Sequence, residues 1–262
     1  MCSFREEDMA ETKNRDNRNK LSSLFQRING REAPAILRRE ASRLITTVKP
    51  KDIAQAERDL VDIGFTVQLA RQLSATFMMM GLLEKKDHIR TILPANHILH
   101  LVLVEHDMLR IFVAELKDLA NTIVHLDSLS NVSSEFCKLT HVTSHLHAMK
   151  EHFDRENDVI FPFLRKLGWS NLCDTEYDDH EFITLAINDL IKLIGSFDDL
   201  KLETFKSRLI TITGCFCPTM SEHITREDML LYPIAFEAIK DPGVWKKMKS
   251  ICDDIGYCGT HI

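Results

Sequence analysis

Residues 152–162 read HFDRENDVIFP, and residues 223–233 read HITREDMLLYP. Both stretches begin with a histidine, place a glutamate four positions later and close on an aromatic residue followed by proline. On an α-helix, a separation of four residues is about 400° of rotation, so the two side chains leave the same face one turn apart. Each stretch can therefore offer one nitrogen and one carboxylate oxygen to the same metal ion. Two such stretches are much harder to obtain by chance than one.

The sequence around these stretches predicts long helices. After Pro94, which suits the first turn of a helix, apolar residues recur at helical spacing in four long segments. The breaks between the segments are rich in Asp, Ser, Asn and Gly, which favour turns and helix caps. Four long helices with short connections form an antiparallel up-down-up-down four-helix bundle, so we expect an all-α fold. The expected helices cover residues 95–127, 133–167, 175–196 and 200–240.

The first and third predicted helices each add one histidine in an acidic setting. His106 lies between Glu105 and Asp107, and His180 follows two aspartates. With a rise of about 1.5 Å per residue, the four histidines lie within about two helical turns of one another along the bundle, which allows a common layer. The candidate metal ligands are therefore His106, His152, Glu156, His180, His223 and Glu227.

These six side chains favour a pair of divalent cations. A surface His–Glu pair would stabilise a helix by roughly a few tenths of a kcal/mol, but both pairs here adjoin large apolar residues. Buried without a cation, each imidazole or carboxylate would cost several kcal/mol. Four imidazoles and two bridging carboxylates suit two divalent cations, and iron, manganese and zinc all accommodate such donors. With these six protein ligands, coordination positions on the two cations remain open for water, O2 or NO.

The first part of the chain contains no histidine before His88 and predicts a different domain. Residues 1–18 are polar and low in apolar content, which predicts a disordered tail. Residues 19–90 predict a small helical domain that ends in a charged stretch, ahead of the bundle at 95–240. Residues 241–262 predict one further helix and a tail.

Composition and charge exclude several classes of protein. The 262 residues carry 33 basic and 39 acidic side chains, and the net charge of −6 argues against nucleic acid as a partner. No uncharged apolar run is long enough to cross a membrane, and the N-terminus lacks the apolar core of a secretory signal. Seven cysteines without regular spacing predict free thiols rather than a disulfide framework. We therefore expect a cytoplasmic protein without a membrane partner.

Taken together, the motifs resemble the hemerythrin-like (HHE cation-binding) family, whose fold is a four-helix bundle with a non-haem di-iron centre. The resemblance spans about residues 95–240. Histidines on the first and third helices and the H-x-x-x-E pairs on the second and fourth carry it, together with the closings Phe161-Pro162 and Tyr232-Pro233. It implies that the six candidate ligands hold two iron ions and that the protein binds a small diatomic ligand, O2 or NO.

Two departures from the oxygen-carrying members qualify this resemblance. Those members have a second histidine four residues after the first ligand of the third helix, where this chain has Thr184. They also use H-x-x-x-x-D on the fourth helix, a spacing that His223 and Asp228 satisfy. Glu227 is preferred because it repeats the geometry of Glu156, with Asp228 as the alternative. The count of four histidines and two glutamates is more similar to di-iron proteins linked to iron–sulfur cluster repair and nitric-oxide stress. Those proteins carry a cysteine-bearing N-terminal segment that is not clear in this chain.

The segment at 19–90 resembles an uncharacterised helical domain that precedes hemerythrin domains in bacterial and archaeal proteins. That family often has a cysteine and a histidine after the matching segment, whereas residues 73–77 read LSATF in this chain. The resemblance therefore gives this domain no thiol or metal role and leaves the binding of a protein partner as its expected contribution. The residues that carry this weaker match are Ile53, Glu57, Leu60 and Gly64.

Three further histidines are of interest. His141 and His145 lie within about 20° of His152 around the helix. They line an access route, supply a substitute ligand or are polar residues at the mouth of the bundle. His97 matches a histidine that is frequent at this point in the family.

The leading hypothesis is a di-iron protein that binds or senses O2 or NO, or takes part in iron handling or iron–sulfur cluster repair under oxidative or nitrosative stress. A first alternative is a di-metal hydrolase, or an enzyme that reduces peroxide or NO. An enzyme would need a general base or a reducing thiol beside the centre, and the sequence names none. A second alternative is an interaction module with zinc or no metal in the bundle, whose N-terminal domain binds a partner.

Overall fold

The computed structural model describes residues 3–30, 32–82 and 88–257, and every regular element in these ranges is a helix. The predicted all-α class is therefore confirmed. The chain divides into two compact units. The first is formed by Met1–Ile92 with Thr225–Glu237, and the second by Leu93–Ile224 with Ala238–Ile262.

Local signals place the N-terminal helices of the first unit. Pro34 and Pro50 open two of them, at a position where the missing N–H would have no partner in any case. The backbone N–H of Lys49 donates to the Asp52 carboxylate at 2.8 Å, which caps the helix that follows. Gly64, with a φ of 102°, ends that helix in a conformation that favours glycine. The helices are α1 (Ser3–Asn29), α2 (Pro34–Leu44), α3 (Pro50–Asp62), α4 (Val67–Leu82) and α5 (His88–Ile92).

The structure has a helix where the sequence predicts a disordered tail for residues 1–18. Helix α1 begins at Ser3. The segment has few apolar residues, but it lacks glycine and proline and is rich in Glu, Lys and Arg, which favour a helix. Arg18 also forms an ion pair with Asp59 of α3. Helix propensity and this ion pair account for the difference from the prediction over residues 3–18.

The core of the first unit lies between α1 and the shorter helices. Leu21, Leu24 and Phe25 of α1 are fully buried. The ring of Phe25 meets Phe77 of α4 edge to face, with ring centroids 5.7 Å apart. Leu60 of α3 is buried as well. Apolar side chains from α1, α3 and α4 therefore form part of this core.

The segment Thr225–Glu237 belongs to the first unit by its contacts, whereas the sequence predicts it as the end of the fourth bundle helix. Arg226 is fully buried, and its guanidinium donates to Glu57 at 2.6 Å and to Ser74 Oγ at 3.0 Å. A buried arginine needs such partners, because an unpaired buried charge is strongly destabilising. These contacts account for the difference from the predicted boundary.

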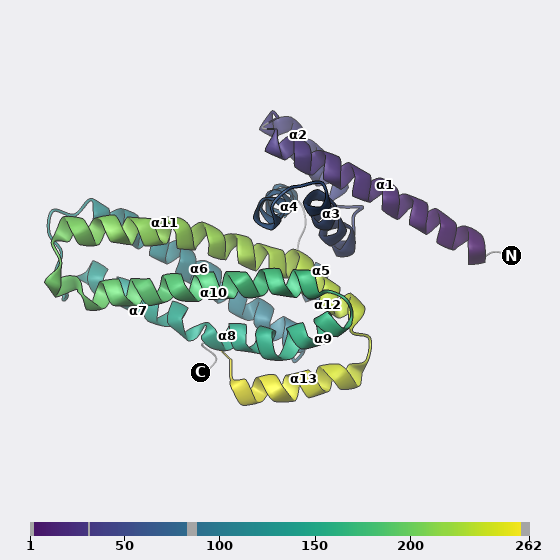
Figure 1. Ribbon diagram of the computed structural model, residues 1–262. Coiled ribbons are helices and arrows are strands. Elements are labelled where there is room, and N and C mark those ends of the chain that lie inside the picture. Colours follow the sequence, from purple (N-terminus) through teal and green to yellow (C-terminus); the bar gives the residue numbers. More distant parts are fainter. Residues whose placement is uncertain (1–2, 31, 83–87, 258–262) are drawn as a thin grey trace. The chain divides into compact units, whose positions relative to one another are not determined.

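The second unit contains the long helices of the predicted bundle, which run side by side in Figure 1. Short connections make neighbouring helices antiparallel. The first helix is α6 (Ile98–Val124), and the second is built from α7 (Ser134–Ala148), α8 (Lys150–Arg155), the π-helical turn η1 (Glu156–Ile160) and α9 (Phe161–Lys166). The third is α10 (Ser170–Gly195), and after the short turn η2 (Phe197–Asp199) the fourth is α11 (Leu202–Arg226). The chain continues from α11 into the π-helical turn η3 (Glu227–Leu231) and α12 (Tyr232–Ala238), in the segment that belongs to the first unit.

The core of the bundle is apolar along most of its length. Leu116 of α6, Leu139 of α7, Leu190 of α10 and Leu209 of α11 are examples of its buried members. Near the start of α7, three phenylalanine rings pack together: the ring of Phe197 lies 4.6 Å from Phe136 and 4.9 Å from Phe205 between centroids. The faces that the helical periodicity predicts as apolar thus meet inside the bundle.

A last helix, α13 (Pro242–Ile255), packs against α6, α8 and η1 of the bundle. It begins after Asp241, whose carboxylate accepts from the Gly243 N–H at 2.7 Å. Trp245 fixes its first turn, because the indole N–H donates to the carbonyl oxygen of Ile239 at 2.9 Å. The sequence treats residues 241–262 as a separate C-terminal region, whereas the described part of this region packs with the second unit.

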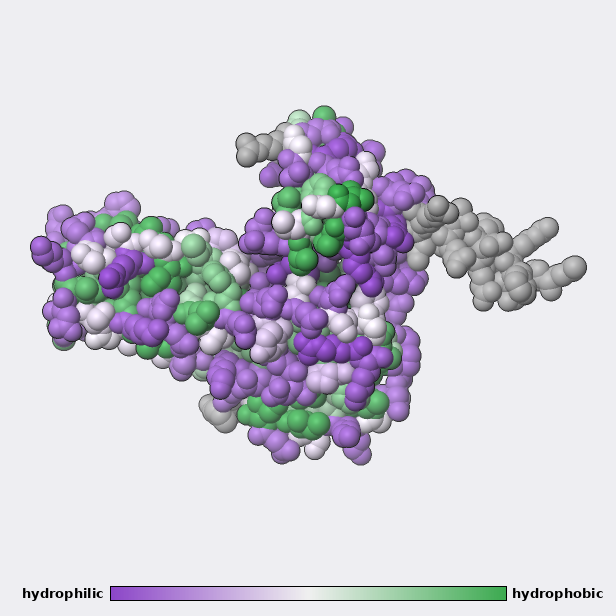
Figure 2. Space-filling model, in the orientation of Figure 1, coloured by the Kyte–Doolittle hydropathy of each residue, from purple (hydrophilic) through white to green (hydrophobic). Residues whose placement is uncertain are grey.

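The described helices present mainly polar faces to solvent. None of them is long and apolar enough to span a membrane. In Figure 2 the visible surface is mostly hydrophilic, with separate apolar areas between. Exposed large apolar side chains include Met108 and Ile111 on α6 and Phe182 and Leu185 on α10.

The described cysteines are free thiols, and they differ in burial. Cys137 and Cys215 are exposed. Burial raises the pKa of Cys173 to about 12, of Cys217 to about 11 and of Cys252 to about 12. Because only the thiolate reacts, we expect iodoacetamide at about pH 8 to alkylate the two exposed cysteines first and the three buried ones only after unfolding. Peptide mass mapping checks this order, and equal labelling of Cys173 and Cys215 in the folded protein would contradict it.

The aromatic group at the start of α7 predicts a large stability effect. Phe205 is fully buried, and its replacement in Phe205→Ala leaves a cavity, so we expect a loss of about 3–5 kcal/mol in the free energy of unfolding. Phe182→Ala, at a side chain that is 44% exposed, is the matched control and should change stability by less than about 0.5 kcal/mol. Urea denaturation followed by circular dichroism measures both. Equal losses for the two variants would contradict the packing described.

Candidate metal centre

Each of the two repeated sequence stretches contains a π-helical turn that starts at its glutamate. In η1 the N–H of Phe161 donates to the carbonyl of Glu156, and in η3 the N–H of Tyr232 donates to the carbonyl of Glu227. A proline follows each aromatic residue, and a proline lacks the N–H of the normal bond and crowds the carbonyl four residues earlier. The wider turn relieves this crowding. The repeated F-P and Y-P closings therefore appear in the structure as two equivalent turns, of a kind that is frequent at functional sites.

The six predicted ligands are all buried, with exposed fractions between 0% and 3%. Their nitrogen and oxygen atoms form two groups, in each of which the ligand atoms lie within 4.8 Å of one another. The first group is Glu156, His180, His223 and Glu227, and the second is His106, His152 and Glu227. Glu227 belongs to both groups, so its carboxylate would be shared by two ions if each group held one.

The shortest distances between the ligands join their inward-facing atoms. His106 Nε2 lies 3.1 Å from His152 Nε2. Glu156 Oε2 lies 3.2 Å from His180 Nε2 and 3.5 Å from His152 Nε2. Glu156 is therefore between histidines of the two groups, and it too can act as a bridge.

Three of the histidines are oriented through their outer nitrogen, Nδ1. His152 Nδ1 donates to Glu105 at 2.8 Å, and His223 Nδ1 donates to Glu176 at 3.2 Å. A carboxylate can only accept, so these contacts fix a proton on Nδ1 and leave the lone pair of Nε2 for a metal.

The third outer partner is an amide. His180 Nδ1 lies 2.9 Å from Asn157 Oδ1, which accepts from it. The sequence did not identify Asn157 or Glu176 as partners, although Asn157 directly follows the ligand Glu156 and Glu176 lies one turn before His180 on α10. Helical spacing around a candidate ligand is the signal that could have found them.

The charges around the ligands shift their pKa values. Burial alone would raise the pKa of Glu156, but the imidazoles of His152 and His180 outweigh it and hold the pKa well below its usual range. Burial alone would lower the pKa of His223, but the carboxylates of Asp179 and Glu176 outweigh it and raise the pKa to about 9, so a metal that binds Nε2 would have to displace a proton from it. Burial also lowers the pKa of His180. The site therefore favours an ionised Glu156 in a buried setting.

Two phenylalanine rings pack against His180 on one side of the site. The ring of Phe153 stacks on His180 with centroids 4.1 Å apart, and Phe161 stacks at 5.6 Å. Phe153 also meets the ring of His223 edge to face at 5.7 Å. These apolar contacts fix the imidazoles and narrow the space around the donor atoms.

Several other candidates lie outside the ligand groups. Asp228 is buried but belongs to neither group, which favours Glu227 over the alternative. His97 caps α6, because its Nδ1 accepts from the Leu99 N–H at 3.1 Å. His141 and His145 contact each other on α7, with ring centroids 4.5 Å apart, and neither belongs to a metal-ligand group found in the described residues.

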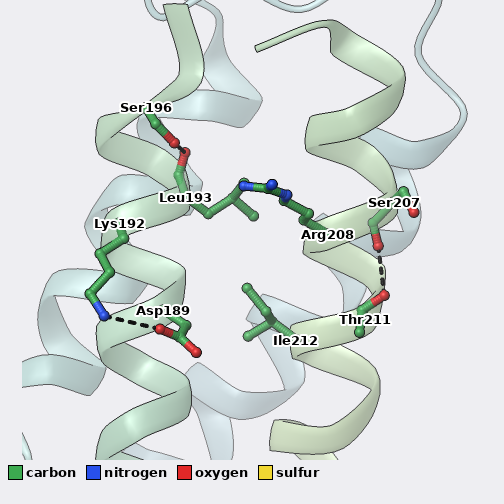
Figure 3. Close-up of a pocket in the computed structure, with 8 residues that line it drawn as sticks. All are labelled: Asp189, Lys192, Leu193, Ser196, Ser207, Arg208, Thr211 and Ile212. Atoms are coloured by element: carbon green, nitrogen blue, oxygen red, sulfur yellow. Dashed lines mark hydrogen bonds and ion pairs between the residues drawn. The ribbon is translucent and has the colours of Figure 1, made fainter. Parts of the chain in front are cut away.

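A separate hollow of about 350 Å³ lies between α10 and α11 (Figure 3). Asp189 and Lys192 form an ion pair of 3.2 Å at one side of it. Asp189 follows His180 by nine residues, or ~13 Å along α10, so the hollow is not part of the ligand cluster. Its lining residues are Asp189, Lys192, Leu193, Ser196, Ser207, Arg208, Thr211 and Ile212.

A bundle of four long helices that buries histidines and carboxylates from each helix defines a class of metal-binding helical proteins. The family model of the hemerythrin HHE cation binding domain matches residues 97–242, which is more than half of the chain. The chain therefore belongs to the hemerythrin HHE cation-binding family. Among curated proteins, no sequence gives a significant match.

The outer hydrogen bonds predict an effect on metal affinity. In Glu176→Gln the carboxylate that holds the proton of His223 Nδ1 becomes a neutral amide, so we expect about a 10–100-fold loss of metal affinity. Glu181→Gln, at an exposed position on the same helix, is the matched control and should leave the affinity unchanged. Competition with a metallochromic chelator measures both. Equal affinities for the two variants would rule out the orienting role of Glu176.

Proposed function

We propose that this chain is a non-haem di-iron protein that binds O2 or NO, as a sensor or scavenger or in iron handling or iron–sulfur cluster repair under oxidative or nitrosative stress. One observation carries the proposal: two overlapping groups of buried ligand atoms contain four imidazoles and two glutamates between them. The overlap at Glu227 supports a pair of ions rather than two independent sites.

The donor set fits iron. Four imidazole nitrogens with two carboxylates suit iron, manganese or zinc, and no cysteine belongs to the ligand groups among the described residues. With six protein ligands shared between two octahedral ions, positions for a further ligand remain on each ion. Bound iron would supply a redox centre with such open positions, which O2 and NO require.

The burial of the site supports a small ligand. The six ligands are at most 3% exposed, and Phe153 and Phe161 stack against the imidazole of His180. A bulky or charged substrate would have to displace these rings. A neutral diatomic molecule can reach such a site through small fluctuations of the packing.

The side chains around the ligands have two tasks in this proposal. Glu105, Glu176 and Asn157 accept from the Nδ1 atoms and keep the Nε2 atoms aimed inward. The rings of Phe153 and Phe161 limit the access of water, and a lower local dielectric strengthens the electrostatic interactions of the centre.

Iron content tests the proposal. Protein produced in iron-replete medium and purified under anaerobic conditions should contain about two irons per chain, as a ligand set of this kind implies. Its optical spectrum should change on addition of O2 or NO. Glu156→Ala combined with Glu227→Ala should remove both proposed bridging carboxylates and abolish iron binding. The free energy of unfolding should then lose the contribution of bound metal, which is about 2.7 kcal/mol when the free metal concentration is a hundred times the dissociation constant.

A matched double variant makes this test specific. Glu115→Ala with Glu181→Ala removes two exposed glutamates from the bundle and should leave the iron content unchanged. Two zinc ions, or no metal, in the parent protein would contradict the proposal and favour an interaction module. Repeated turnover of peroxide or NO would instead favour an enzyme.

A further inference from the structure

Each repeated stretch has an arginine directly before its glutamate, Arg155 before Glu156 and Arg226 before Glu227. Both side chains have no exposed surface. Arginine is almost never fully buried without charged or polar partners. The partners of Arg155 lie within the second unit and lead from the ligands to the end of α13.

The structure describes three partners of the Arg155 guanidinium, each of a different kind. It donates to the carboxylate of Glu105 on α6 and to the backbone carbonyl of Gly256, just beyond α13. It also lies over the ring of Tyr257, 4.7 Å from the centroid, which is the geometry of a cation–π contact. Two of the three partners are therefore supplied by the two residues that follow α13.

The carboxylate of Glu105 connects this arginine to a metal ligand. Its Oε2 atom accepts both from Arg155 and from the Nδ1 of His152, 2.8 Å away. Glu105 is 3% exposed, so water does not screen these contacts. A continuous chain of contacts therefore runs from Gly256 and Tyr257 through Arg155 and Glu105 to His152.

The backbone conformation of Gly256 suits its contact with Arg155. Its φ of 104° and ψ of 176° lie in a region that is essentially restricted to glycine. A Cβ at this position would lie 3.4 Å from Glu151 Oε2. The residue after it is held as well, since the Tyr257 hydroxyl donates to Asp253 at 2.9 Å and Asp253 pairs with Lys249 on α13.

We propose that α13 and the two residues after it are a positioning element of the metal centre, which holds His152 through Arg155 and Glu105. This inference rests on the proposed function, because it assumes an ion at the His106 and His152 group. It predicts an asymmetry, since His180 and His223 are oriented by Asn157, Glu176 and Asp179 instead. Gly256, Tyr257 and Arg155 should therefore affect one of the two ions.

Two chain lengths separate this role from general stabilisation. The first variant ends at Tyr257 and keeps every partner of Arg155 named above. The second ends at Ile255 and lacks Gly256 and Tyr257. Both lose residues 258–262, so their difference reports on the two contact residues alone. Gly256→Ala is made in the full chain and moves the Gly256 carbonyl through backbone strain, without shortening the chain. Tyr257→Phe is the conservative control, because it keeps the aromatic ring over Arg155.

The measurement is the release of iron from the loaded, reduced protein to an excess of a coloured ferrous chelator, together with the iron content before release. The full chain, the chain that ends at Tyr257 and Tyr257→Phe should release their two irons alike. In the chain that ends at Ile255 and in Gly256→Ala, one iron should leave about tenfold faster or more while the other keeps its rate, by analogy with the loss of an outer partner of a ligand.

Two results would overturn the inference. One is equal release of both irons in all variants, and the other is an equal acceleration of both irons, which marks general loosening of the fold. If the full chain itself takes up no iron, the proposed function fails, and the inference falls with it. Normal iron content with unaltered release in the shortened chain instead rejects the positioning role alone.

Discussion

The burial of ionisable donors inside the bundle is the constraint on which the rest of the structure depends. Removing imidazoles and carboxylates from water is costly, and a native fold retains them only where other groups compensate. In this chain the outer atoms of the histidines are matched by Glu105, Glu176 and Asn157, and the inner atoms converge on one another. The proposed pair of cations between the inner atoms would complete this compensation.

The same constraint explains the features that surround the ligands. The two π-helical turns occur where a glutamate ligand and a following proline share one turn of helix. Arg155 and Arg226, each next to a glutamate ligand, are both buried and both hold carboxylates distant in sequence, Glu105 in one case and Glu57 in the other. The internal repeat of the sequence therefore repeats three features: a candidate ligand pair, a π-helical turn and a buried arginine.

The sequence predicted the helices of the bundle well, because apolar periodicity and turn residues are local signals. The H-x-x-x-E spacing also selected candidate ligands that the structure brings into overlapping groups, since that spacing fixes two side chains on one face. The spacing of residues could not predict the contacts that orient the candidate ligands, because these contacts join distant parts of the chain. Glu105 and Arg155 are fifty residues apart, and Gly256 follows Arg155 by about a hundred residues. Residues 3–18 were misjudged for another reason, because low hydrophobicity conceals a high helix propensity.

In the proposed centre, the buried histidines and glutamates hold two ions close together. Anomalous diffraction from crystals of the iron-loaded protein, measured above and below the iron absorption edge, locates these ions. We expect two iron peaks per chain, one beside His106 and His152 and one beside His180 and His223, with Glu156 and Glu227 between them. A single peak, or iron bound only at other residues such as His141 and His145, would contradict it.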